Sequence, residues 1–370
     1  MPTSKITIEL EHQLAQMHNR RFCLLVSRGT TAIYLALKVL GLRPGKVILP
    51  SILCLNPANA VIYAGLEPFF CDVNLTDYNL DIEDLKRILK THRDVRCLIL
   101  AHSFGQPGDI EEIVNITQKN RIALIEDVAQ ALGGEYKGKP LGSFGDISIL
   151  SFGHTKIIDV GGGGAILFDR KEYLKDFQYH LKRLPYRIKN YSSLNETYRK
   201  VYYALASIVR EDFSLGRLYY SFPYLFRDLY LYGDLKVEFA LKLKKALKTL
   251  KSVVDYRNEN AGIYRKYLIH PKIRHPHYRF KGVFWRYSFL IHSPYQQDIA
   301  QAIRDKGIDV SNWYPPVHLF YDLDPRPLRK AEYLGKHIFN LWVDGRLIKR
   351  DIRRNIDCIL KILDQYERKG

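Results

Sequence analysis

Seven short apolar runs in the first half of the chain constrain its fold more than any other feature of the sequence. Most are continuous rather than alternating, which is typical of strands in a sheet covered on both faces. The runs are 21–27, 46–51, 67–73, 96–103, 122–128, 146–152 and 164–169. Helix-like segments separate several of them, at 30–40, 56–65 and 81–90. This βαβ alternation predicts an α/β protein with a mostly parallel, seven-stranded sheet.

The remainder of the chain has a different rhythm. Residues 170–232 are basic and aromatic and lack the βα alternation, and a long helical pattern follows from 234 to about 268. Beyond it we expect strands and helices in turn, at 284–292, 299–306, 309–314 and 352–366. We therefore expect a large domain over 1–232, which carries 170–232 as an insertion. A linking helix and a small α+β domain are expected over 233–370.

Composition excludes several classes of protein. Hydrophobic residues make up 46% and charged residues 26% of the chain, which is ordinary globular composition, and no apolar stretch approaches the ~20 residues of a membrane span. The five cysteines are odd in number and show no CxxC spacing, so we expect free thiols and no metal site. The formal charge of +18 favours anionic partners. We expect a cytoplasmic protein.

Three local patterns follow predicted strands, at the edge where open α/β sheets bind their ligands. Thr30 begins a helix whose free N–H groups suit a phosphate, and a simple helix cap is the alternative. Asp127, at the end of a strand, suits a metal ligand, a base, a partner for a protonated ring nitrogen, or a helix cap. Lys156, ahead of the glycines at 161–164, is either a Schiff-base former or a solvated surface residue.

The three patterns together favour one cofactor. A lysine for an aldehyde, an acid for a pyridinium nitrogen and a helix start for a phosphate are the three groups that pyridoxal phosphate (PLP) requires. The sequence therefore predicts a PLP site that contains Lys156, Asp127 and the helix start at Thr30.

Further motifs occur in a fixed order along the chain. They include Arg28-Gly29-Thr30-Thr31-Ala32, Gly65-Leu66-Glu67-Pro68, His102-Ser103-Phe104-Gly105, Glu126-Asp127-Val128-Ala129-Gln130, Gly142-Ser143-Phe144-Gly145 and Tyr314-Pro315-Pro316. As a set they resemble the DegT/StrS family of nucleotide-sugar aminotransferases, which are fold-type I PLP enzymes. The resemblance is dense over 21–170 and thinner over 234–370.

The resemblance implies a role for each matching residue. Lys156 binds the cofactor and moves the proton at the reacting carbon, and Asp127 pairs with the ring nitrogen. Cys54 stands where relatives commonly have an aromatic residue stacked on the ring. The cofactor-binding residues implied are Gly29, Thr30, Thr31, Cys54, Asp127, Gln130, Ser151 and Lys156. Family members move an amino group, commonly from glutamate, to a keto sugar nucleotide, and their subunits pair as homodimers with shared sites.

The resemblance therefore implies a sugar aminotransferase for surface polysaccharide, lipopolysaccharide or a glycosylated metabolite. Four residues are candidates for the substrate pocket, although ordering of its loop explains the last equally well: His154, Trp313, Tyr314 and His318. The sequence departs from the family pattern at positions that include Cys54 and Trp313. These changes affect the residues expected to stack on the cofactor ring and to line the entrance of the substrate pocket. They leave two alternatives: a PLP enzyme with another reaction or a non-nucleotide ketone, and a non-catalytic family member.

The basic aromatic segment 170–232 allows three interpretations. It is a lid that neutralises a diphosphate and stacks a base or sugar, an amphipathic surface for an anionic membrane, or a solvated insertion with its aromatic residues in the core. Its arginines include Arg183, Arg187, Arg199, Arg210, Arg217 and Arg227. Nucleic-acid binding is not expected, because no known reader motif occurs and positive charge alone is nonspecific.

Overall fold

The seven apolar runs form one sheet in the computed structural model, which describes residues 4–186, 190–233, 235, 237–321 and 326–367. The strands are β1 (Phe22–Val26), β2 (Lys46–Pro50), β3 (Glu67–Cys71), β4 (Val95–Ala101), β5 (Ala123–Asp127), β8 (Ile147–Ser151) and β9 (Gly164–Phe168). Their order across the sheet is β1-β9-β8-β5-β4-β2-β3. Only β9 among them runs antiparallel to its neighbours, β1 and β8. The predicted mostly parallel sheet is confirmed.

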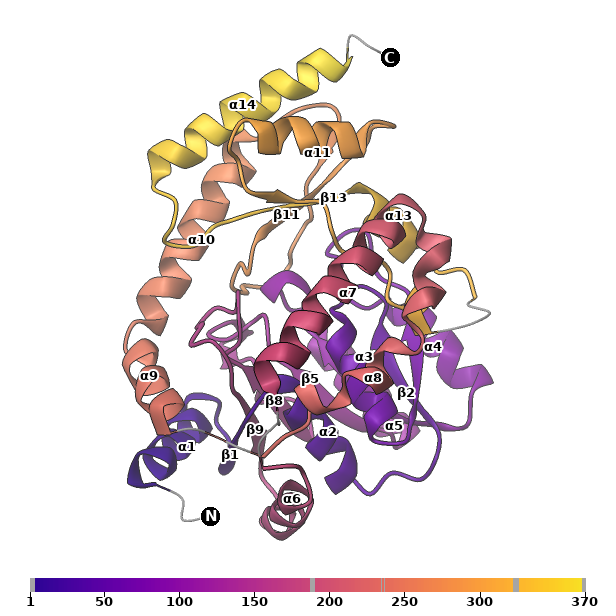
Figure 1. The fold of residues 1–370 in the computed structure, drawn as a ribbon, viewed down its shortest axis with the longest axis vertical. Coiled ribbons are helices and arrows are strands. Elements are labelled where there is room, and N and C mark those ends of the chain that lie inside the picture. The colour runs from indigo at the N-terminus through magenta and orange to yellow at the C-terminus, as the bar shows by residue number, and fades with distance from the viewer. Residues whose placement is uncertain (1–3, 187–189, 234, 236, 322–325, 368–370) are drawn as a thin grey trace.

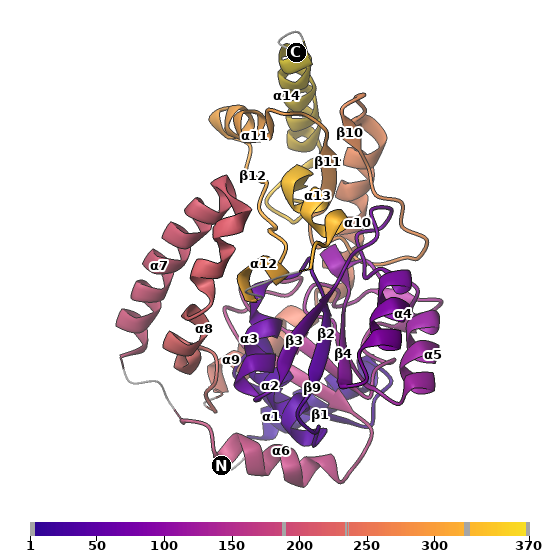
Figure 2. The same cartoon turned by 90° about the vertical axis from the view of Figure 1, so that its right-hand side faces the viewer.

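Helices cover both faces of this sheet (Figure 2). On one face lie α2 (Gly29–Val39) and α3 (Leu55–Tyr63), and on the other lie α4 (Ile82–Thr91) and α5 (Ile110–Asn120). This division follows from right-handed crossovers, because the chain moves outward along the sheet through α2 and α3 and back through α4 and α5. Asp81 and Asp109 begin α4 and α5 by accepting hydrogen bonds from amides of the first turn.

A second sheet of four strands forms the upper part of the molecule in Figure 1. Its order is β10 (Ile273–Arg274), β11 (Tyr287–Ile291), β13 (Ile338–Leu341) and β12 (Val310–Ser311), and all its pairs are antiparallel. It shares a core of its own with α10 (Leu250–Tyr267), α11 (Gln296–Asp305) and α14 (Lys349–Glu367). The sequence pattern does not predict β13 or α13 (Arg329–His337).

The long helical pattern after residue 234 is divided into α9 (Val237–Leu247) and α10. Ala240 and Leu243 of α9 belong to the core of the first sheet, whereas Ala261 and Tyr264 of α10 belong to the core of the second. The passage from one core to the other therefore lies within α10. At the other end of the chain, α1 (Lys5–Met17) packs against β1 and α9.

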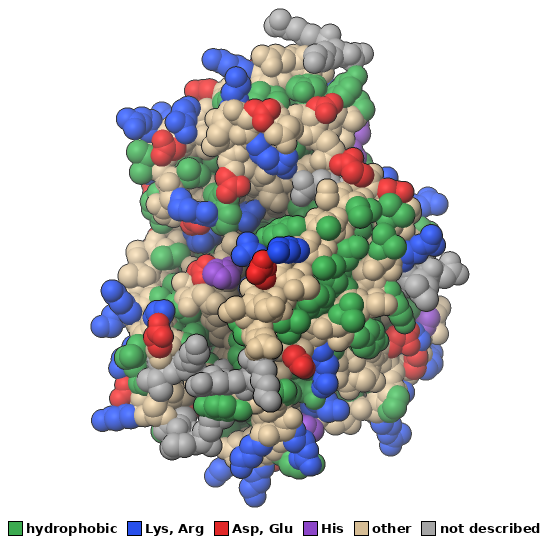
Figure 3. Space-filling model, viewed as in Figure 1, with side chains coloured by type: hydrophobic (Ala, Val, Ile, Leu, Met, Phe, Trp, Pro, Cys, Tyr) green, Lys and Arg blue, Asp and Glu red, His purple; other side chains and the backbone are tan. Residues whose placement is uncertain are grey.

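Segment 170–232 is mostly helical. Its elements are α6 (Tyr173–Lys182), α7 (Tyr191–Glu211), the 3-10 turns η2 (Phe213–Tyr219) and η3 (Arg227–Leu229), and α8 (Phe222–Leu225). Many of its aromatic rings pack together, with Tyr219 and Tyr230 buried. Hydrophobic side chains also lie exposed along α7 and α8 (Figure 3). Among the described helices, none is both long and apolar enough to cross a membrane.

Candidate active site

The carboxyl ends of β1, β5 and β8 open on one cavity of about 630 Å³. Six of the predicted cofactor residues line it: Gly29, Thr30, Cys54, Asp127, Ser151 and Lys156. An adjoining cavity of about 30 Å³ shares Cys54, Asp127 and Lys156 and adds Gln130 and Tyr314. The fold thus brings together residues from positions 29 to 314 of the chain.

Lys156 is half-buried on the loop that follows β8. The preceding residue, Thr155, has a φ of 65°, in the left-handed region that a β-branched residue rarely adopts. Two contacts hold Thr155 there: its amide donates to Asp159 at 2.9 Å, and its carbonyl accepts from the Trp285 indole at 2.5 Å. The loop that carries the amine is therefore fixed by a contact within the loop and by Trp285, a residue of the core of the first sheet.

The two carboxylates at the end of β5 lie in different surroundings, because successive strand residues face opposite sides of a sheet. Glu126 is fully buried and accepts hydrogen bonds from His102, from Ser148 and from three backbone amides, those of Gly142, Phe144 and Gly145. Burial alone would raise the pKa of Glu126, but the bonds from His102 and the amides outweigh it and hold that pKa below its ordinary value.

Asp127 lines the cavity beside Lys156. Burial raises the pKa of its carboxyl above the ordinary value, and the Ala129 amide, which donates to Oδ1 at 2.9 Å, and the positive charge of Lys156 oppose that rise. A buried carboxylate of this kind is stabilised by a cationic partner such as a protonated ring nitrogen. The chemistry of this residue pair fits PLP.

The start of α2 provides the phosphate-binding groups. Its cap residue, Arg28, makes no side-chain cap bond, so the amides of the first turn have no side-chain acceptor. A Cβ on Gly29 would lie 3.1 Å from the Cβ of Ser151, so a larger residue would crowd Ser151 and the close approach of the helix start to β8 favours glycine. Amides, a hydroxyl and a helix N-terminus converging on one end of the cavity suit the phosphate of PLP.

Thr31 differs from the expectation. Its side chain is buried, its hydroxyl donates to the carbonyl of Tyr230 at 2.6 Å, and it does not line the cavity. The hydroxyl therefore ties α2 to the segment after α8, and only Thr30 of the pair presents its side chain to the cavity.

Cys54 and Gln130 flank the Lys156–Asp127 pair. Cys54 begins α3 and is exposed to both cavities, so a thiol stands where the family pattern has an aromatic ring. The Gln130 amide is fixed at both ends, since its Oε1 accepts from the Phe104 amide at 2.9 Å and its Nε2 donates to the Tyr314 hydroxyl at 2.7 Å. Gln130 thus connects the loop after β5 to the segment after β12 (Val310–Ser311).

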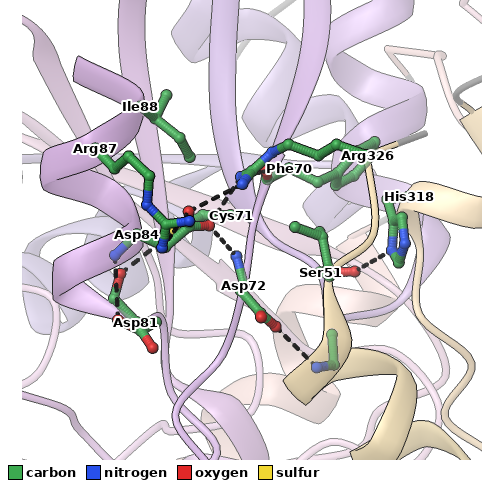
Figure 4. Close-up of polar contacts among 12 residues, drawn as sticks. Ser51, Phe70, Cys71, Asp72, Asp81, Asp84, Arg87, Ile88, His318 and Arg326 are labelled. Carbon is green, nitrogen blue, oxygen red and sulfur yellow. Dashed lines mark hydrogen bonds and ion pairs between the residues drawn. The ribbon is translucent and has the colours of Figure 1, made fainter. Parts of the chain in front are cut away.

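The four substrate candidates separate in the structure. His154 is exposed and lines the 630 Å³ cavity. Tyr314 lines both the small cavity beside Lys156 and a neighbouring one of about 660 Å³, which Trp313 also lines. His318 does not line the cavities that hold Lys156. Its imidazole is buried, with Nδ1 2.7 Å from the Ser51 hydroxyl (Figure 4), an arrangement that favours the loop-ordering alternative over contact with substrate.

One face of α7 also lines the cavity and was not among the predicted site residues. Its members are Tyr191, Asn195, Arg199 and Tyr203. Their spacing of four residues marks a helix face. Arg199 is named above with the basic segment, for which a lid is one of three interpretations, but the sequence does not indicate which residues of α7 face the cavity. Arg187, named above with the basic segment, lies outside the described residues.

The strand order and the Lys156–Asp127 pair define a class, the fold-type I PLP-dependent transferases with a large α/β part and a smaller α+β part. A putative sugar aminotransferase of Streptococcus pneumoniae, solved in a PLP form, superposes with a TM-score of 0.78 over 98% of this chain and 92% of its own, at 18% identity. That likeness shows the fold.

Sequence comparison gives the family. The DegT/DnrJ/EryC1/StrS aminotransferase family matches residues 3–199, and the chain belongs to this family. A GDP-perosamine synthase of Escherichia coli O157:H7 is 34% identical over 175 residues, which cover 47% of each chain. A UDP-4-amino-4,6-dideoxy-N-acetyl-beta-L-altrosamine transaminase of Campylobacter jejuni is 33% identical over 167 residues, 45% of this chain and 44% of its own. The matched stretch is thus less than half of either relative.

Proposed function

We propose that this protein is a PLP-dependent aminotransferase that moves an amino group, from glutamate, to a keto sugar nucleotide used in surface polysaccharide, lipopolysaccharide or glycosylated-metabolite synthesis. The observation that carries the proposal is the single cavity shared by the Lys156 amine, the Asp127 carboxylate and the cradle at Gly29 and Ser151. The names of the matched relatives, which are sugar-nucleotide aminotransferases, support it.

When bound, PLP supplies an aldehyde that takes up an amino group and a ring that accepts the electrons of a broken Cα–H bond. Asp127 would hold the proton on the ring nitrogen, and the start of α2 with Ser151 would hold the phosphate. The Lys156 amine would hold the cofactor through its aldehyde. The same amine would carry protons, taking one from the donor's Cα and giving one to the carbon that was the acceptor's ketone.

The proposed enzyme works as a homodimer in the cytoplasm, as the family resemblance implies. Its five cysteines are free, which suits a reducing compartment. Sedimentation of the purified protein should give twice the chain mass. A monomer that catalyses amino transfer at full rate would contradict the proposed homodimer.

The test is an absorbance spectrum of the purified protein, taken before and after glutamate is added. We expect a visible band from the lysine-bound cofactor that fades with glutamate and returns with the correct keto sugar nucleotide. The Lys156→Ala variant is the control and should lack the band. A band indifferent to glutamate contradicts the donor, and a colourless protein that PLP cannot reconstitute contradicts the enzyme.

A further inference from the structure

One face of α7 forms a wall of the cavity that holds Lys156. Tyr191, Asn195, Arg199 and Tyr203 follow one another at four-residue spacing and all line the cavity that holds Lys156. An adjacent face of the helix fixes this orientation, because Leu194, Tyr198 and Tyr202, each one residue before a member of the row, pack against the core of the first sheet. The helix therefore presents a fixed row of polar and aromatic groups to the cavity.

The lining of the cavity as a whole carries more positive than negative side chains. The cavity lining holds Arg28, Lys156 and Arg199, against one carboxylate, that of Asp127. The Arg28 guanidinium is held by neutral groups, since it donates to the hydroxyls of Tyr191 at 2.6 Å and Tyr232 at 3.3 Å. No acidic side chain in the described part of the chain pairs with Arg199. An anionic ligand would pair with these cations through charge-assisted hydrogen bonds.

Lys200, the neighbour of Arg199 on α7, shows what an ordinary surface cation does in the same helix. Its ammonium pairs with Glu196 at 2.8 Å, one turn earlier, and it does not line the cavity. Arg199 is also exposed and directly precedes Lys200 in the chain, but it lines the cavity. The charge of Arg199 is therefore available to a ligand in the cavity, whereas the charge of Lys200 is paired on the surface of the helix.

The cavity has room and donors for two anions. The start of α2 and Ser151 account for the cofactor phosphate at one end, and Arg199 belongs to a different wall. The volume of about 630 Å³ lies within the roughly 300–1,000 Å³ of pockets that enclose drug-sized ligands. Tyr203, one turn beyond Arg199, adds an exposed ring at the same wall.

We propose that α7 is the wall that binds the nucleoside diphosphate part of the acceptor. The planar fork of Arg199 holds the diphosphate through paired N–H···O bonds, and the ring of Tyr203 stacks on the base or sugar. This inference rests on the proposed function and names the residues of this chain that select its substrate class. The diphosphate is recognised by the same chain that supplies Lys156.

The test measures binding of UDP, GDP and dTDP to the PLP-loaded enzyme by calorimetry, without any reaction. At least one nucleotide should bind the wild type, and Arg199→Ala should weaken it by about 10- to 100-fold. The matched control, Lys200→Ala, removes the same charge from the outer face and should change the affinity less than about twofold. Tyr203→Ala should weaken binding about tenfold, and Tyr203→Phe should retain it.

Several outcomes overturn the inference. The first is an equal loss of nucleotide affinity in Arg199→Ala and Lys200→Ala. The second is no binding of the three nucleotides by the wild type. The third is weaker PLP binding with unchanged nucleotide affinity in Arg199→Ala. The last result would assign Arg199 to the cofactor phosphate. Arg199-dependent nucleotide binding in an enzyme that transfers no amino group would leave the inference standing and overturn the proposed function. Thermal unfolding of each variant confirms that it is folded.

Discussion

The two walls of the active-site cavity are made in different ways. The sheet-side wall consists of groups fixed by backbone and burial: Asp127 at a strand end, Lys156 on a constrained loop, and the close approach of Gly29 to β8. The wall on α7 consists of exposed side chains on a helix surface, Arg199 and Tyr203 among them. The groups proposed for chemistry are thus fixed by the first sheet and its loops, and the groups proposed for recognition stand on the exposed face of a helix that packs against the same core.

The largest effect is expected on the sheet side. Lys156→Ala should lower the rate of amino transfer by roughly 10³-fold or more, because it removes both the cofactor anchor and the proton carrier. Nucleotide affinity, measured by calorimetry, should change little, because α7 is untouched. Full turnover in this variant would contradict the proposed chemistry, and a lost nucleotide affinity would show that the two walls are not independent.

The neighbouring carboxylates of β5 offer the next test. Glu126→Gln should lower the free energy of unfolding by about 2–4 kcal/mol, because an amide N–H₂ would face donors that now bind a carboxylate. Asp127→Asn should leave stability nearly unchanged and reduce the rate about 10²-fold or more. Denaturant unfolding and initial rates measure the two effects. The reverse pattern would exchange the roles assigned to these residues.

A smaller effect concerns pH. Glu11 of α1 accepts a hydrogen bond from the Leu25 amide of β1 at 2.9 Å, and burial raises the pKa of its carboxyl from 4.5 to about 7. Because the folded-state pKa is the higher one, the stability that Glu11 contributes is present below 4.5 and is lost as pH rises through about 7.

Wild-type protein should therefore lose about 1–2 kcal/mol more stability than Glu11→Gln between pH 5 and pH 8. Denaturant unfolding at the two pH values measures this difference, and nucleotide affinity of the variant serves as the control. Identical pH profiles for the two proteins would show that Glu11 is ionised throughout.

The smallest effect tests the position of His318. Ser51→Ala removes the hydroxyl that contacts the His318 imidazole and should cost about 1 kcal/mol of stability. The KM for the sugar nucleotide should stay within about twofold, because neither residue lines the cavities that hold Lys156. A tenfold rise in KM would return His318 to the substrate pocket.

Much of the sheet-side wall is predictable from sequence, because its signals are local. Continuous apolar runs mark the seven strands, and Asp127 and Lys156 stand at or just beyond strand ends. The rest depends on partners far along the chain. The acceptor of the Thr31 hydroxyl, Tyr230, is 199 positions away, and Ser51 and His318 are 267 positions apart. Periodicity shows that α7 has faces but not which one meets the cavity.

The alternation of Glu126 and Asp127 has a consequence for folding fidelity. A strand that slips by one residue turns each side chain to the opposite face, and β5 is apolar enough that its core contacts alone would tolerate the slip. Such a slip would send Asp127 toward the amides of 142–145 and place Glu126 in the cavity. The backbone amides around Glu126 stabilise only the observed register of β5. The contacts that align this strand therefore also determine which of the two acids faces the cofactor site.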